Sequence, residues 1–127
     1  MDVGCKRSGC KDVGEAIAQH LGMQLLYATE FVEFPAPHMR EAKAAGGGVH
    51  GNAIVTWLDV EEAWAFQHAW EPYDWRHRGG MLGEPRAGAR VAVGAELRVP
   101  AGAIRTAATT LRCYSLHLEN FCGVIGR

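Results

Sequence analysis

The sequence has no long hydrophobic run, and this absence limits where the protein can reside. No stretch of its 127 residues approaches the roughly 18 uninterrupted apolar residues of a membrane-spanning helix. The first residues, Met1 to Cys5, also lack the basic start and apolar segment of a secretory signal peptide. We therefore expect no membrane span and an intracellular location.

Cysteine is scarce and widely spaced. The four cysteines form neither a Cys-x-x-Cys pair nor the dense spacing of a disulfide framework; they are Cys5, Cys10, Cys113 and Cys122. Free thiols in a reducing compartment are the favoured interpretation. A zinc site built from all four cysteines is the alternative, and it requires the two ends of the chain to meet.

Neither sign of charge is in strong excess. The 13 basic and 14 acidic side chains give a formal net charge of −1, which argues against a general nucleic-acid coat but permits a local basic patch. The length of 127 residues fits one domain, and a hydrophobic fraction of 48% is ordinary for a globular protein. No obligate protein partner is evident from the composition.

One helix is predicted near the N-terminus, over residues 12–21. Asp12 is a suitable N-cap, and Glu15 stands three residues later as its capping-box partner. The apolar side chains of Val13, Ile17 and Leu21 fall on one helical face. We expect this face to be buried against a sheet.

Alternating or continuous apolar patterns predict five strands. They span residues 23–34, 49–57, 59–70, 90–99 and 109–119. The third is ambiguous: its acidic start suits a helix, but its large side chains alternate with period two up to Trp70, which favours a strand. The last two should pair in antiparallel fashion, and residues 70–89 should form a long loop. These elements indicate an α+β domain.

A histidine lies at the end of the last predicted strand. The alternation over residues 111–119 places His117, and then Glu119, where a half-buried strand meets solvent. A histidine in that position suits a general acid or a phosphate-contacting group. A hydrogen-bonded histidine without a catalytic role is the alternative. The strand that begins at residue 49 carries further polar groups at its head, His50 and Asn52.

Three segments carry a resemblance to a known family. DVGCKRSG at residues 2–9, VHGNAIVT at 49–56 and YSLHLE at 114–119 resemble the endonuclease/exonuclease/phosphatase family, in the same order and with a helix after the first. The resemblance implies a four-layered α/β/β/α sandwich, with two mostly antiparallel mixed sheets face to face and helices outside. It also implies hydrolysis of a phosphate ester, either nucleic acid or a small phosphodiester, usually with Mg²⁺.

The resemblance assigns roles to individual residues. His117 matches the family histidine that ends a central strand and contacts the scissile phosphate or protonates the leaving group. Asn52 belongs to the strand signature, where a structural hydrogen bond and a catalytic role are both open. His50 could contact the substrate, with a solvated loop histidine as the alternative. Glu119 is expected to orient its neighbours or to remain solvated.

The sequence departs from the family pattern where metal ligands are expected. Met1 stands where a Gln-Glu pair would supply the metal-binding glutamate, and the Gly-Asp-x-Asn and Ser-Asp-His motifs do not occur. An asparagine on an earlier strand is also missing, and Trp57 occupies a position that is often basic. The acidic residues from Glu30 onward fit no metal-ligand pattern, so no metal ligand is assigned. We expect residues 1–127 to be one partial domain, without its N-terminal strand and C-terminal half, and inactive alone.

A second hypothesis is a non-catalytic module that binds nucleic acid or phosphate. Within the loop at residues 70–90, residues 73–78 interleave aromatic rings with the positive charges of Arg76 and Arg78. Such a pattern can stack on bases and contact phosphates. A surface loop whose rings pack onto the sheet is the alternative.

Overall fold

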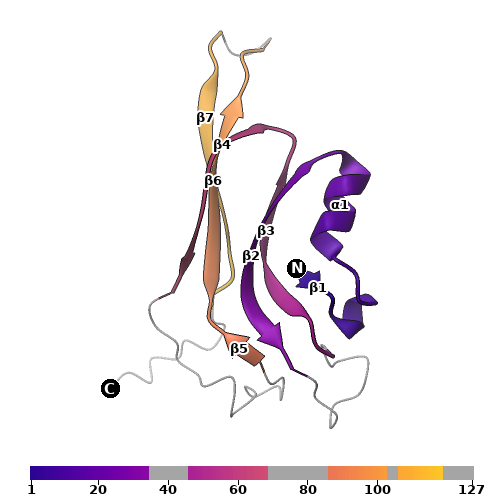
Figure 1. The fold of residues 1–127 in the computed structure, drawn as a ribbon. Coiled ribbons are helices and arrows are strands. Elements are labelled where there is room, and N and C mark those ends of the chain that lie inside the picture. Colours follow the sequence, from indigo (N-terminus) through magenta and orange to yellow (C-terminus); the bar gives the residue numbers. More distant parts are fainter. Residues whose placement is uncertain (35–45, 69–85, 103–105, 119–127) are drawn as a thin grey trace, which may run out of the picture.

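The computed structural model describes residues 1–34, 46–68, 86–102 and 106–118. Within these ranges the protein is of the α+β class, with one α-helix and two antiparallel sheets (Figure 1). The expected class and the two sheets are therefore confirmed. No helix in the described ranges is long and apolar enough to span a membrane.

The described residues contain seven strands, and five of them match the predicted ones. The strands are β1 (Asp2–Val3), β2 (Gln24–Glu33), β3 (Val49–Thr56), β4 (Asp59–Gln67), β5 (Arg86–Gly88), β6 (Val91–Val99) and β7 (Thr109–Leu116). A short 3-10 helix, η1 (Lys6–Ser8), follows β1. The ambiguous segment after residue 59 is a strand, as favoured. The short strand β5 was not predicted, because it lies inside the segment expected to be a loop.

The strands are divided between two sheets that the chain joins twice. Their orders are β1-β3-β2-β5 and β4-β6-β7, and every neighbouring pair is antiparallel. Trp57 and Leu58 connect β3 to β4, and the Leu58 amide donates a hydrogen bond to Thr56 Oγ1 at 2.9 Å. Ala89 and Arg90 connect β5 to β6. The predicted antiparallel pairing of the last two long strands is confirmed as β6 with β7.

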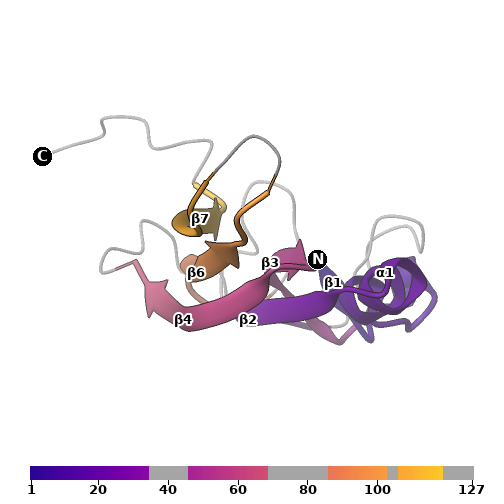
Figure 2. The same cartoon turned by 90° about the horizontal axis from the view of Figure 1, so that it is seen from above.

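Three of the four expected layers are present. Helix α1 (Val13–Leu21) lies on the outer side of the four-stranded sheet, and the three-stranded sheet lies on the other side (Figures 1 and 2). In the part of the chain that the structure describes, no helix covers the outer face of β4-β6-β7.

Helix α1 begins as predicted but buries a different face. The Asp12 side chain accepts a hydrogen bond from the Glu15 amide at 2.9 Å and so caps the helix. The buried positions are Gly14 and Ala18, whereas Ile17 is 39% exposed. The expected burial is wrong for Ile17 and Leu21, which are exposed, while Val13 is partly buried. The small residues Gly14 and Ala18 instead allow the helix to lie close to the sheet. The predicted apolar face instead lines an open hollow of about 390 Å³ on the outer surface.

The core between the sheets is built mainly from β6. Its buried side chains at alternate positions are small or aliphatic, namely Val93, Ala95 and Leu97. Gly94 pairs with Trp64 on β4, and a Cβ at Gly94 would lie 2.6 Å from the indole ring. Any larger residue at this position would displace Trp64, so the glycine is a packing requirement.

Large apolar side chains remain exposed on the second sheet. They include Phe66 on β4 and a series on and after β7, namely Leu111, Tyr114, Leu116 and Leu118. Phe66 and Leu116 lie on the same face of this sheet, since both pair with Ala92, and this shared cross-strand partner is small. Among the described residues, these large side chains therefore have no apolar cover.

Candidate functional site

Three titratable side chains from both sheets meet at one place. Glu30 comes from β2, His50 from β3, and His117 directly follows β7. One ligand atom of each lies within 4.8 Å of the others. The two imidazole rings meet edge to face, with centroids 6.4 Å apart. The fold therefore brings together two of the predicted site residues and one that the sequence did not indicate.

A β-bulge directs Glu30 into the space between the sheets. The register of β2 against β3 shifts between Thr29 and Phe31, so Glu30 has no cross-strand partner on β3. Glu30 and Phe31 are consecutive residues, and Arg90 contacts both, with Nη1 3.2 Å from Glu30 Oε1 and the guanidinium 5.1 Å from the Phe31 ring centroid. A bulge redirects side chains in this way and is common beside functional sites.

The backbone of the neighbouring strand holds this bulge in place. The Ala89 amide donates a hydrogen bond to the Glu30 carbonyl at 3.0 Å. Gly88 has φ +139°, and a Cβ there would lie 2.1 Å from the same carbonyl oxygen. Only glycine fits this backbone approach. The unpredicted strand β5 thus has a direct part in positioning Glu30.

One oxygen of the Glu30 carboxylate accepts a hydrogen bond, and the other accepts none from the described residues. Arg90 Nη1 donates a hydrogen bond to Oε1 at 3.2 Å, in a side chain that is itself 8% exposed. Oε2 is buried and has no hydrogen-bond partner among the described residues. Its nearest charged or titratable neighbours are His117 Nδ1 at 3.7 Å and His50 Nε2 at 4.0 Å. A buried carboxylate oxygen without a partner is costly, so this position favours a cation or a donor.

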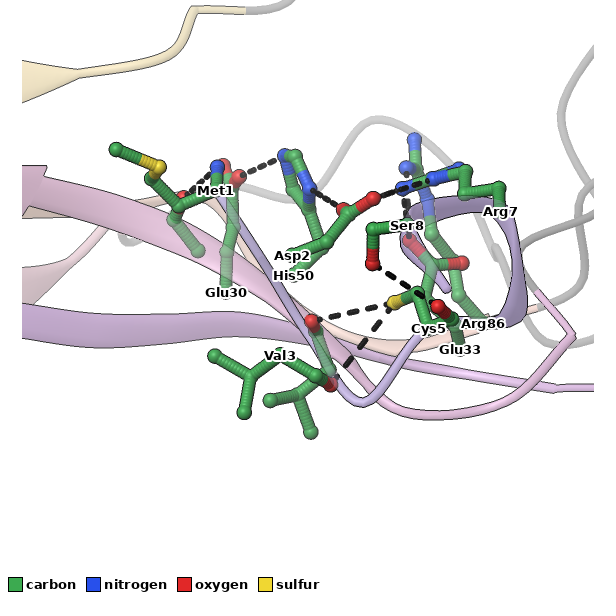
Figure 3. A network of polar contacts seen from close by, with 12 residues as sticks. Met1, Asp2, Val3, Cys5, Arg7, Ser8, Glu30, Glu33, His50 and Arg86 are labelled. Atoms are coloured by element: carbon green, nitrogen blue, oxygen red, sulfur yellow. Dashed lines mark hydrogen bonds and ion pairs between the residues drawn. The ribbon is translucent and has the colours of Figure 1, made fainter. Parts of the chain in front are cut away.

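Asp2 fixes the orientation of His50. His50 Nδ1 lies 2.9 Å from Asp2 Oδ1, and Arg7 donates two hydrogen bonds of 2.8 Å to the same carboxylate. The Arg7 guanidinium holds the pKa of Asp2 well below its usual range. Asp2 is therefore ionised and accepts the hydrogen of Nδ1, which leaves a lone pair on His50 Nε2. Figure 3 shows these contacts running from Glu30 through His50 and Asp2 to Arg7.

His50 is a neutral, partly buried strand residue. Burial lowers its pKa, and this effect outweighs the hydrogen bond to Asp2, which raises the pKa. The side chain is 22% exposed and belongs to β3, so the alternative of a solvated loop histidine is wrong.

Arg90 determines which nitrogen of His117 carries the proton. Arg90 Nη1 lies 2.9 Å from His117 Nδ1. A guanidinium can only donate, so Nδ1 accepts, and the hydrogen of a neutral ring is on Nε2. The His117 side chain is 43% exposed. It follows β7, which is an edge strand among the described strands of its sheet, so the expectation of a central strand is wrong for the part of the chain that the structure describes.

Asn52 joins the two sheets. Its Nδ2 donates a hydrogen bond to the Val91 carbonyl at 2.6 Å, from β3 in one sheet to β6 in the other. Of the two roles left open for Asn52, this contact favours the structural one. The remaining predicted residues, Arg76, Arg78 and Glu119, lie outside the described residues.

A second buried carboxylate lies beside the first. Glu33 is fully buried, and its Oε1 lies 3.7 Å from Arg7 Nη2 and 3.8 Å from Arg86 Nη1. The Arg86 guanidinium also lies over the Phe31 ring, 4.1 Å from its centroid. The site region thus balances three carboxylates against three guanidinium groups; they belong to Asp2, Glu30 and Glu33 and to Arg7, Arg86 and Arg90.

The donor set at this place does not fit magnesium. Mg²⁺ prefers oxygen ligands in octahedral geometry, whereas Glu30, His50 and His117 offer one carboxylate and two imidazoles. No other group of three possible ligands occurs in the described part of the chain, and no cysteine there belongs to one. Cys5, Cys10 and Cys113 are free thiols, as predicted, and burial raises the pKa of Cys5.

No protein-family model matches the chain, and no curated protein or solved structure is significantly similar to it. The resemblance to the endonuclease/exonuclease/phosphatase family therefore depends on the three sequence segments alone.

Proposed function

We propose that the chain recognises phosphate esters as part of a phosphoesterase of the nuclease-like class, with His117 as the group that contacts the phosphate. The observation that carries the proposal is the contact between Arg90 and His117 Nδ1. It fixes a hydrogen on Nε2, on a side chain that is partly open to solvent. The sequence resemblance independently assigns the same histidine to the scissile phosphate.

The arrangement suits the chemistry of phosphate-ester cleavage. The N–H of His117 Nε2 can donate a hydrogen bond to a phosphate oxygen or to the leaving-group oxygen. The Arg90 guanidinium, directly behind the ring, stabilises negative charge that gathers in front of it. Arg90 also aligns the imidazole, because the hydrogen bond to Nδ1 restricts rotation of the ring. These two residues supply a hydrogen-bond donor and a positive charge for binding a phosphate group.

We do not expect fast turnover by this chain. Phosphoesterases of this kind use a divalent ion to neutralise charge on the phosphorus-bound oxygens. The described residues offer no oxygen-rich cluster for magnesium. Phosphate binding is therefore the property to measure first.

The test is a titration of the chain with phenylphosphonate and with a dinucleotide, in buffer that contains a chelator. His117→Gln should weaken binding at least tenfold, whereas the exposed helix residue His20 provides the control variant His20→Gln, which should bind like the wild type. Equal binding by the wild type and His117→Gln would overturn the proposal.

The same titration distinguishes this proposal from the alternative of a non-catalytic binding module. If an oligonucleotide binds through residues 70–90, Arg76→Ala or Arg78→Ala should weaken its binding, and His117→Gln should leave its binding unchanged. That result would move the phosphate contact from the strand end to the aromatic and basic segment.

A further inference from the structure

Three acceptor atoms face one another between the two sheets. His50 Nε2 has a free lone pair because Nδ1 donates to Asp2, whereas the lone pair of His117 Nδ1 accepts the hydrogen bond from Arg90. Glu30 Oε2 completes the group, and all three atoms lie within 4.8 Å of one another. Converging acceptors repel each other unless a proton donor or a cation lies between them.

Two further features resemble the surroundings of a metal site. The Glu30 side chain is fully buried, and its Oε2 has no hydrogen-bond partner among the described residues. The pair of Asp2 and His50 has the form of a carboxylate–histidine unit, in which a carboxylate orients a metal-binding imidazole. Asp2 is fixed in turn by two hydrogen bonds from Arg7.

We infer that Glu30 Oε2, His50 Nε2 and His117 Nδ1 form a site for a zinc-class divalent transition metal. Two imidazoles and one carboxylate are donors that such ions prefer, and magnesium does not. Three protein ligands leave one coordination position for water or for an oxygen of a substrate. This inference goes beyond the proposed phosphate recognition and does not depend on it.

The spacing of the two carboxylate–imidazole pairs is close to that of tetrahedral coordination. Ligand bonds of about 2.0–2.1 Å place neighbouring ligand atoms roughly 3.3 Å apart. The pair of Glu30 Oε2 and His117 Nδ1 is at 3.7 Å, and the pair of Glu30 Oε2 and His50 Nε2 is at 4.0 Å. Contractions of about 0.4 and 0.7 Å, the differences from 3.3 Å, would bring these pairs to the required distance.

Arg90 competes with the ion for one ligand atom. A metal on His117 Nδ1 displaces the Arg90 hydrogen bond, while the contact with Glu30 Oε1 can remain. In both states the hydrogen of His117 is on Nε2, so the phosphate-facing side of the ring is unchanged. Removal of the guanidinium should therefore strengthen metal binding, whereas removal of a ligand should weaken it.

The experiment is a titration of the purified chain with Zn²⁺, and with Co²⁺ as a spectroscopic probe. One ion should bind per chain. Glu30→Gln and His50→Gln should each lower the affinity at least tenfold, and Asp2→Asn should lower it by roughly 10–100-fold, as expected for a second-sphere carboxylate. Arg90→Met should bind more tightly than the wild type. His20→Gln should behave like the wild type, and Mg²⁺ should not compete.

Three results would overturn the site. They are unchanged affinity in Glu30→Gln, competition by Mg²⁺ at similar concentration, and a thiolate-to-cobalt absorption band, which would assign the ion to cysteine. Circular dichroism of each variant checks folding, and Glu30→Gln preserves the shape of the side chain. Zn²⁺ should raise the Tm of the wild type and leave that of Glu30→Gln unchanged. Phosphonate binding in chelator is measured separately, so the two proposals can fail independently.

Discussion

Arg90→Met is expected to destabilise the fold by about 3–5 kcal/mol, the usual cost of removing one partner from a buried ion pair. Glu30 is fully buried, and Arg90 Nη1 is its hydrogen-bonded cation at 3.2 Å. The Arg90 guanidinium also lies 5.1 Å from the centroid of the Phe31 ring. Methionine can fill much of this space, so the variant removes mainly charge and hydrogen bonds rather than packing.

A double-mutant cycle separates the unpaired charge from other effects. Glu30→Gln/Arg90→Met has no ionised group at either position. It should therefore be more stable than Arg90→Met alone, and the full cycle should give a coupling energy of roughly 1–3 kcal/mol. Glu30→Gln alone retains an acceptor for Arg90 and should cost less than Arg90→Met.

Urea unfolding followed by circular dichroism, in buffer with a chelator, measures all four proteins of this cycle. The chelator matters because bound zinc would stabilise Arg90→Met and conceal the cost. An Arg90→Met protein within about 1 kcal/mol of the wild type, the range of an exposed pair, would show that Glu30 is not a desolvated carboxylate.

Three further predictions follow from individual side chains. Asn52→Ala should lower the unfolding free energy by about 1–3 kcal/mol, because the Val91 carbonyl loses its donor, and should leave phosphonate affinity unchanged; the reverse pattern would indicate a catalytic role. Burial raises the pKa of Tyr27 to about 12, so the unfolded chain releases this proton first and stability should fall from about pH 10 to 12. Tyr27→Phe should reduce that slope in alkaline urea titrations, and an unchanged slope would refute it. Iodoacetamide should modify the exposed Cys10 much faster than the buried Cys5, and equal rates would contradict the packing.

The sequence predicted most of the strands because their apolar side chains either alternate or follow one another continuously. β2, β3, β6 and β7 each carry one of these two patterns. The helix was located by its cap at Asp12, but its buried face was not. Gly14 and Ala18 contribute little to the apolar pattern of the helix, yet their small size decides which side of the helix approaches the sheet.

The sequence predicted the two histidines of the site, but it did not predict Glu30 or Arg90. His117 and His50 stand at visible strand ends. The sequence does not show that Glu30 faces the second sheet, because its orientation depends on the β-bulge between Thr29 and Phe31. The short strand β5 that holds this bulge lies in a segment with few apolar residues. Arg90 carries no sequence signal of its own, because its importance comes from a buried carboxylate 60 residues away in the chain.

The protonation of the two site histidines is the most direct test of the proposed phosphate contact. A long-range proton–nitrogen NMR spectrum of isotope-labelled, metal-free protein near neutral pH distinguishes the two ring nitrogens of each histidine. We predict hydrogen on Nε2 of His117 and on Nδ1 of His50, as the contacts with Arg90 and Asp2 require. Phenylphosphonate should then shift the Nε2 resonance of His117. Hydrogen on Nδ1 of His117 would contradict the Arg90 contact, and with it the phosphate-facing donor.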